Sequence, residues 1–353
     1  MCTEVLRVLL VALPAQCGRV FVRSVAEICI FLCLGFFLLQ PACASVPVLA
    51  DDRLDHVPIE NALEYWIEDA PADSNTLLHN PEAFPWKLLQ GRSPNFGFDK
   101  HAYWYRFDLR NPDEKTQEFV LEIDYPVLDY VDIYLKQENG SWALHRFGDK
   151  IPFAVRTVKH HNFVLPFSID GKAGQQVLLR VQTNGSHQLP LTVWKRLAFE
   201  QHNQNQLLGQ GLYFGVMMVM LLYNLFIFMS VRDFSYLFYV GSVASFMMFQ
   251  AGLHGFSFEF FWPEATEWND TSIAVSIGSF GFFGSLAVLT FLRLKQNAPF
   301  FFKLLGAFTA LNLISVGLAF VLPYDIAVRL ASALGFPEQV ICVVAGLVLL
   351  ARG

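Results

Sequence analysis

The sequence predicts a membrane protein of two domains, an all-β sandwich followed by an all-α bundle of transmembrane helices. Composition is the first reason: 54% of the residues are hydrophobic and 16% are charged, whereas a soluble globular domain has roughly 25% charged residues. Short alternating segments fill residues 46 to 200, and long uncharged segments follow from residue 207. The net charge of -6 provides no basic surface, so we exclude nucleic acid as a partner.

Residues 1–44 are typical of a signal peptide for export. Three arginines precede the apolar stretch Ile28–Leu39, which is too short to span a membrane, and Pro41–Ala44 supplies small residues for cleavage before Ser45. The alternative is an uncleaved anchor, since the segment before the apolar stretch is long and Glu27 borders it. Five of the six cysteines lie within the first 43 residues, so we expect the exported domain to fold without disulfides.

The exported domain, residues 45–200, has the pattern of an antiparallel β-sandwich. The segment Tyr103–Leu109 alternates strictly, with Tyr103 and Tyr105 on one face and Trp104 and Arg106 on the other. Turn signals such as Asn111-Pro112 and Asp170-Gly171 separate it from similar segments. We predict further strands at 119–123, 130–135, 142–147, 162–165, 177–181 and 191–194. At least seven short strands without helical patterns between them indicate a sandwich.

No catalytic or metal site is predicted in the sandwich, and no cofactor is expected. His160 and His161 are adjacent, so on a strand they would face opposite ways and share no metal. Asp124 and Asp129 flank a proline corner, where carboxylates more often accept hydrogen bonds from turn amides than act as acid or base. We find no nucleophile motif and no phosphate-binding glycine loop. An enzyme is therefore the weaker interpretation.

Several polar and aromatic residues are candidates for ligand contact. Arginines on strands bind carboxylates or sugar hydroxyls, although for Arg156 and Arg180 a buried structural pair is an equal alternative. Trp66, Trp104 and Trp194 have the rings that stack on a sugar, although tryptophan in a sandwich more often belongs to the core. The predicted ligand-binding residues are Trp104, Arg106, Asp124, Asp129, Tyr134, Arg156, Arg180 and Asn184.

The second domain, residues 201–353, contains uncharged segments long enough to cross a bilayer. Residues 207–231 carry no charge and, at about 1.5 Å per residue, exceed the roughly 30 Å hydrocarbon core. A fifth span requires Pro337 and Glu338 inside the helix. The predicted spans are 207–231, 236–257, 272–292, 304–322 and 331–351.

Charges in the loops predict the orientation of these spans. Basic residues occupy the first and third turns, namely Arg232 and then Arg293, Lys295 and Lys303. The loop after the second span is acidic and contains Trp262 and Trp268, which fit an outer aromatic belt. The positive-inside rule then places the sandwich outside, with Arg329 as the one exception.

Polar residues inside the spans have two interpretations. Amides such as Asn224 and Asn312 either line a transport pathway or hydrogen-bond a neighbouring helix, and the second is more common. Gln250 and His254 have the same two interpretations. We interpret Gly278, Gly281 and Gly284 as surfaces for close helix packing.

Several stretches resemble one bacterial receptor family. In the sandwich these are Tyr103–Asn111, Leu121–Asp129 with Tyr134, Gly148–Arg156, and Leu178–Trp194; in the membrane domain they are Gly211–Leu225 and Tyr236–Val240. They look like the type 2 extracellular domain and the membrane region of seven-transmembrane receptors with diverse intracellular signalling modules (7TMR-DISM).

This resemblance implies a periplasmic jelly-roll-like sandwich that binds carbohydrate or another small ligand, seven helices, and a cytosolic output module such as a cyclase or kinase. The sequence departs from that plan, because it supplies about five helices and no output module, so no catalytic activity is carried over. We expect a multi-pass receptor in the inner membrane of a Gram-negative bacterium, with the lipid bilayer, a small ligand and either a second copy or a separate signalling protein as partners. The alternatives are a truncated, non-signalling fragment, a partner-dependent receptor that takes its output from another chain and, more distantly, a small-molecule transporter.

Overall fold

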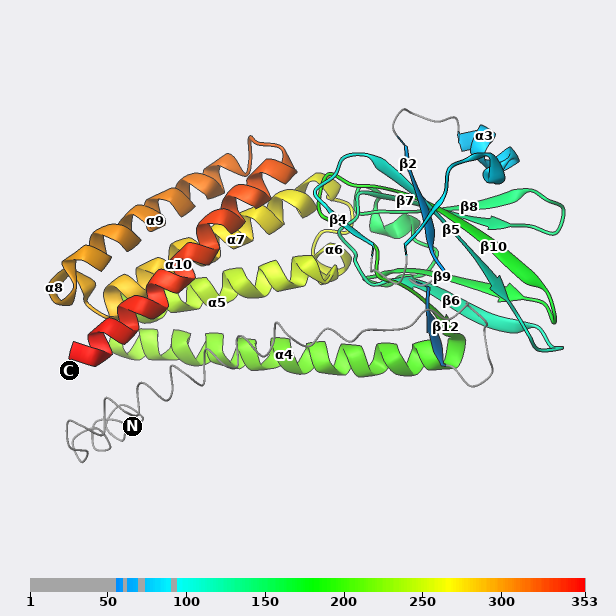
Figure 1. The fold of residues 1–353 in the computed structure, drawn as a ribbon. Coiled ribbons are helices and arrows are strands. Elements are labelled where there is room, and N and C mark those ends of the chain that lie inside the picture. The colour runs from blue at the N-terminus through cyan, green and yellow to red at the C-terminus, as the bar shows by residue number, and fades with distance from the viewer. Residues whose placement is uncertain (1–54, 60–61, 69–73, 90–93, 353) are drawn as a thin grey trace. The chain divides into compact units, whose positions relative to one another are not determined.

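The computed structural model describes the chain except for residues 1–54, 60–61, 69–73, 90–93 and 353. The predicted signal peptide, residues 1–44, lies outside the described residues. Residues 45–353 form one compact unit, in which antiparallel strands up to residue 195 are followed by long helices (Figure 1). The predicted fold class is therefore confirmed.

The described strands form two main sheets and one short pair, and all neighbouring strands are antiparallel. The six-stranded sheet has the order β3-β2-β5-β10-β7-β8 and comprises β2 (Glu64–Glu68), β3 (Lys87–Leu88), β5 (Ala102–Arg110), β7 (Tyr130–Lys136), β8 (Trp142–Phe147) and β10 (Gly174–Gln182). The four-stranded sheet has the order β1-β12-β6-β9 and comprises β1 (His56–Pro58), β6 (Gln117–Ile123), β9 (Phe163–Ile169) and β12 (Leu191–Lys195). The short pair is β4 (Asn95–Gly97) with β11 (His187–Gln188).

The core lies between the two main sheets. As the alternation in β5 predicts, Tyr103, Tyr105, Phe107 and Leu109 enter this core, where they meet residues of the four-stranded sheet such as Leu121. The opposite face of the six-stranded sheet, called the outer face below, is also partly buried. Helix α3 (Ser74–His79) and the 3₁₀ turn η1 (Pro81–Ala83) lie on the chain between β2 and β3, and Leu77 of α3 packs with Trp104 there.

The argument that the His160 and His161 rings would face opposite ways on a strand does not apply in the structure. Both residues lie in the irregular segment between the 3₁₀ turn η2 (Phe153–Val155) and β9. Their rings stack with centroids 4.1 Å apart. The physical reason is that β9 begins only at Phe163, so the period-two rule does not apply to the residues before it.

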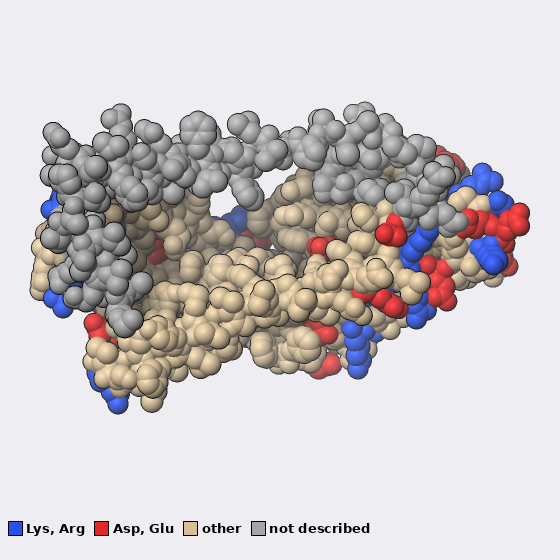
Figure 2. All heavy atoms as spheres, turned by 90° about the horizontal axis from the view of Figure 1, so that it is seen from below, with Lys and Arg blue, Asp and Glu red and all other residues tan. Residues whose placement is uncertain are grey.

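Five described helices are long and apolar enough to span a membrane: α4 (Arg196–Val231), α5 (Phe234–Leu253), α7 (Thr266–Phe291), α9 (Pro299–Leu318) and α10 (Tyr324–Arg352). Two short helices join them, α6 (Phe256–Phe260) and α8 (Leu294–Asn297). On the face drawn in Figure 2, charged side chains gather over the sandwich and at the helix ends, and the surface between them is mostly uncharged.

All five long helices begin before the predicted spans, and the differences are largest for α4 and α10. Helix α4 follows β12 without a loop and starts at Arg196, not at residue 207. Its first turns are held by the sandwich, since Phe199 packs with Val120, Val164 and Trp194. Helix α10 starts at Tyr324 and continues through Pro337.

Small residues set the helix packing. A Cβ atom on Gly278 would stand 2.9 Å from a Val316 methyl group, and one on Gly281 would stand 2.7 Å from Glu338 Oε2. One on Gly284 would lie 3.4 Å from Ser242 Oγ. The interpretation as close-packing surfaces is confirmed for Gly278 and Gly281, where a Cβ atom would stand too close to the neighbouring helix. At Gly284 the distance is that of an ordinary van der Waals contact.

Candidate functional site

A cavity of about 1150 Å³ opens at the end of the sandwich where β5, β7 and β9 end and β10 begins. We call it the distal cavity. Core residues such as Leu109, Leu135 and Ile169 contribute its apolar part, and the turns contribute amide and charged groups. Its polar lining residues include Asp108, Arg110, Lys136, Gln137, Asn139, Asp170, Lys172, Gln175 and Gln176. A mixed apolar and polar lining of this kind suits a small ligand.

None of the eight residues predicted to bind ligand lines the distal cavity. Four of them lie on the outer face of the six-stranded sheet. Trp104 is fully buried there and its ring stacks on Tyr134, with centroids 5.7 Å apart. Arg180 Nε and Trp104 Nε1 each donate to Glu68 Oε2 at 2.9 Å. Arg106 pairs with Glu64 and Glu82 and covers the Trp86 ring. All four side chains are thus in contact with other residues of the protein. Their role in binding a ligand stays a prediction.

The other four lie at the opposite end of the sandwich, where its loops meet the helices. Asp129 is buried just before β7, and Asn184 just after β10 donates to it through both its backbone and side-chain nitrogens at 2.9 Å. Asp124 accepts a hydrogen bond from Asn162 Nδ2 at 2.7 Å. The expectation that these carboxylates bind turn amides thus holds for Asp129, although the amide comes from a different loop.

Arg156 is buried between the sandwich and α6. Its Nη1 donates to the carbonyl oxygens of His160 and His161 at 2.7 and 2.9 Å, and its guanidinium lies over the rings of Phe153 and Phe258. Burial lowers the pKa of Arg156 to about 10, against the opposing effect of nearby carboxylates. The arginine therefore joins a sandwich loop to the helical region.

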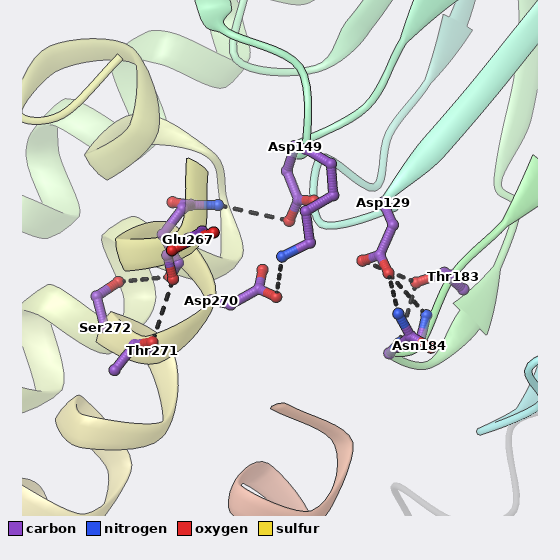
Figure 3. Close-up of polar contacts among 11 residues, drawn as sticks. Asp129, Asp149, Thr183, Asn184, Glu267, Asp270, Thr271 and Ser272 are labelled. Atoms are coloured by element: carbon purple, nitrogen blue, oxygen red, sulfur yellow. Dashed lines mark hydrogen bonds and ion pairs between the residues drawn. The ribbon is translucent and has the colours of Figure 1, made fainter. Parts of the chain in front are cut away.

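Four residues at this boundary form what we call the junction cluster: Asp129, Asp149, Lys150 and Asp270. Oxygens of the three carboxylates lie within 4.8 Å of one another, and all three residues are buried. Lys150 forms an ion pair with Asp270 on the first turns of α7, and Asn269 Nδ2 donates to Asp149 Oδ2 at 3.4 Å (Figure 3). Three oxygen ligands have the composition of a divalent-cation site, but the Lys150 ammonium already brings a positive charge to them.

Asp149 is the least satisfied member of the junction cluster. It is 1% exposed and its Oδ1 has no hydrogen-bond partner. Burial raises the pKa of the Asp149 carboxyl well above its ordinary value, and the neighbouring Asp270 and Asp129 carboxylates raise it further. The pKa of Lys150, which burial alone would lower, is raised by Asp270. The cluster therefore favours a neutral Asp149 beside a charged lysine.

Further contacts extend this boundary. The Phe153 amide donates to Pro263 O at 2.9 Å, Lys100 pairs with Asp325 at 3.1 Å, and Arg329 lies over the Phe98 ring. Gly255, between α5 and α6, has a φ of +74°, and a Cβ atom there would stand 2.8 Å from His161 O. Loops of the sandwich thus contact the segments around α6 and the starts of α7 and α10.

Sequence analysis missed Asp149, Lys150 and Asp270 as functional candidates. Asp149 and Lys150 lie within the stretch Gly148–Arg156, and Asp270 lies in the acidic loop predicted after the second span. The sequence feature that could have indicated this cluster is Gly148. Its φ is +144°, and a Cβ atom at this position would stand 2.0 Å from Asp129 O, so only glycine lets the backbone approach Asp129 this closely. That approach brings Asp149 beside Asp129.

Two protein-family models match the two domains of this chain. The model described as "7TMR-DISM extracellular 2" matches residues 61–195, and "7TM diverse intracellular signalling" matches residues 206–353. The chain belongs to the 7TMR-DISM family. It is therefore a receptor-type, multi-pass membrane protein, and its two matched domains are of sensory rather than catalytic type.

Other comparisons add little to this 7TMR-DISM assignment. No curated protein matches the chain. Among solved structures, a family GH115 4-O-methyl-α-glucuronidase is 10% identical with a TM-score of 0.23, over 44% of this chain and 19% of that one. A GH31 α-xylosidase from Xanthomonas citri is 9% identical with a TM-score of 0.21, over 41% of this chain and 18% of that one. The chain thus spans about a fifth of the length of these enzymes.

Proposed function

We propose that this 7TMR-DISM protein is a sensory receptor whose sandwich binds a small polar ligand, such as a carbohydrate, in the distal cavity and passes the binding state to the helices through the junction cluster. The single observation that carries the proposal is that β7 and β10 connect the two sites. Lys136 at the end of β7 lines the cavity, and Asp129 immediately precedes that strand. Gly174–Gln176 at the start of β10 line the cavity, and Asn184 follows its end.

These two strands are neighbours that pair along Val177↔Leu135 to Gln182↔Tyr130. At about 3.3 Å per residue, β10 spans roughly 30 Å between the two sites. A ligand that changes the separation or twist of the two sheets at the cavity would move Asp129 and Asn184 at the other end. It shifts the helices only if it binds the two arrangements with different affinity.

The orientation belongs to the same proposal. The turns that carry Arg232 and Arg293 lie at the helix ends remote from the sandwich, as does Arg352 at the end of α10 (Figure 1). This supports a periplasmic sandwich and an inner-membrane location by the positive-inside rule. The output would then reach a cytosolic signalling partner at the remote ends.

The test uses the full chain in lipid nanodiscs. Sugars and organic acids are screened by thermal shift, and each binder is retested on Gln176→Leu, which changes the cavity, and on Glu200→Gln, which changes an exposed residue on α4. We expect a binder whose stabilisation is lost in Gln176→Leu and retained in Glu200→Gln. No binder in a broad library, or binding unchanged by the cavity variant, would overturn the assignment of the cavity.

Transmission is tested separately by hydrogen exchange in the first turns of α7. We expect ligand to change exchange around Asp270 in the unaltered chain. In Lys150→Met the ligand should still bind, but the exchange change should be lost, because the pair with Asp270 is removed. Bound ligand without any change in α7 would contradict transmission through the junction cluster.

A further inference from the structure

The helical bundle contains a buried carboxylate in the middle of α10. The Glu338 side chain is 0% exposed and contacts two other helices. Ser285 of α7 donates its hydroxyl to Glu338 Oε1, and Asn312 Nδ2 of α9 donates to Glu338 Oε2 at 2.7 Å. Gly281 provides the space for this approach. Three helices therefore converge on one ionisable group.

Nothing within the described part of the chain balances the charge of Glu338. The ion pairs of the described residues include none to Glu338, and its two hydrogen-bond donors are neutral. An ionised carboxylate inside a membrane bundle is strongly unfavourable unless a positive charge accompanies it. Both carboxylate oxygens accept hydrogen bonds from these donors, which bring no opposite charge to the carboxylate.

Asn312 supplies an independent indication of a missing partner. It is 0% exposed, yet its Oδ1 has no hydrogen-bond partner. The amide orientation is fixed by its nitrogen, which donates to Phe308 O at 3.0 Å and to Glu338 at 2.7 Å. A flipped amide would lose both bonds, so the unpartnered atom is the oxygen.

We propose that Glu338, Ser285 and Asn312 form a sodium-binding site within the bundle. The atoms that would bind the ion are oxygens, namely those of the Glu338 carboxylate, the Ser285 hydroxyl and the unpartnered Asn312 amide carbonyl, and hard cations prefer oxygen ligands. One monovalent ion cancels the single negative charge, whereas a divalent ion would leave a net positive charge in an apolar surrounding. The tight approach at Gly281 favours a small ion. Bound sodium would join α7, α9 and α10, an effect independent of any ligand in the sandwich.

The experiment measures the melting temperature of the full chain in nanodiscs, in sodium chloride and in choline chloride at equal ionic strength. At a sodium concentration about ten times Kd, we expect a rise of roughly 2–4 °C. Glu338→Gln should abolish the rise. Ser285→Ala, which keeps the carboxylate, should require more sodium for the same rise and serves if Glu338→Gln does not fold. Asn224→Leu is the control, because Asn224 is half-buried and its Nδ2 donates to Met220 O within its own helix.

Two results would overturn the proposal. If sodium and choline give equal melting temperatures, while lowering the pH stabilises the unaltered chain but not Glu338→Gln, then a proton rather than sodium neutralises the carboxylate. If Glu338→Gln and Ser285→Ala both keep the full sodium response, then the ion binds elsewhere. Failure of either kind leaves the cavity screen unaffected, so the two proposals are judged separately.

Discussion

The outer face of the six-stranded sheet and the centre of the helical bundle each bury an acidic side chain, but they satisfy it differently. On the sheet, Glu68 meets the guanidinium of Arg180 and the indole of Trp104. In the bundle, Glu338 meets only the neutral donors Ser285 and Asn312. The sandwich therefore supplies a counter-charge to its buried acid, whereas no described residue of the bundle forms an ion pair with Glu338.

The same two regions also differ in how burial is achieved. The outer face is closed by large rings such as Trp104 and Tyr134, which α3 covers. In the bundle the helices pack closely because Gly278 and Gly281 carry no side chain, which lets α7 approach α9 and α10. We therefore expect the sandwich to be sensitive to loss of a side chain and the bundle to be sensitive to gain of one.

The largest expected effect is the loss of the Arg180 counter-charge. Arg180→Met leaves Glu68, whose side chain is 5% exposed, as a buried carboxylate without that cation. Removing one partner of a buried ion pair costs about 3–5 kcal/mol, and unfolding followed by near-ultraviolet circular dichroism measures it. The matched control is Arg146→Met, because Arg146 is 67% exposed where it pairs with Asp132, and surface pairs contribute less than about 1 kcal/mol. Equal losses in the two variants would show that the Glu68 pair is not buried.

The next effect is the addition of one methyl group to the bundle. Gly281→Ala places a Cβ atom 2.7 Å from Glu338 Oε2 and 2.8 Å from Asn312 Cγ, and such overpacking costs about 1–3 kcal/mol. Gly306→Ala on α9 is the control, because its Cβ atom meets nothing within 4 Å and alanine favours the helix. Thermal unfolding in nanodiscs compares the two. If Gly281→Ala is as stable as Gly306→Ala, the three helices do not meet as described.

Local patterns predicted most of the fold, because they act over a few residues. The alternation in Tyr103–Leu109 predicted both the strand and the residues that enter the core, and uncharged length predicted the five helices. The start of α4 was missed, since Arg196–Gln206 is polar and is held partly by the distant Val120 and Val164. Element ends depend on such tertiary contacts, which periodicity does not contain.

The candidate site was less accessible from sequence for the same reason. Residue types made Trp104 and Arg180 candidates, but their partner Glu68 lies 36 and 112 positions away in the chain. Lys150 and Asp270 are 120 positions apart. No spacing rule joins such pairs. In the bundle, by contrast, Glu338 and Asn312 were conspicuous by type alone, because polar groups are rare in membrane helices.

The smallest effect concerns Asp149, where the two regions meet. Because burial and the neighbouring carboxylates raise its pKa, the folded state binds a proton at Asp149 more tightly than the unfolded state does. The contribution of Asp149 to the free energy of unfolding is therefore fully favourable below about pH 4, the pKa of aspartate in the unfolded chain. It is lost as the pH rises through the pKa of Asp149 in the folded state. Asp149→Asn removes this loss, and we expect it to stabilise the chain at pH 7 by about 1 kcal/mol, the order of one unsatisfied buried group.

The pH series must be read as a difference between variants, because His161 acts in the opposite direction. Burial lowers the pKa of His161 to about 3. The contribution of His161 to the free energy of unfolding is therefore lost as the pH falls below about 6.5, the pKa of histidine in the unfolded chain. That contribution is common to both chains and cancels. The stability of Asp149→Asn relative to the unaltered chain should then grow from about pH 4 upward, whereas the exposed change Glu138→Gln should show no such trend. A less stable Asp149→Asn at pH 7 would mean that Lys150 holds Asp149 as an ion, which would make the junction resemble the outer face of the sheet rather than the centre of the bundle.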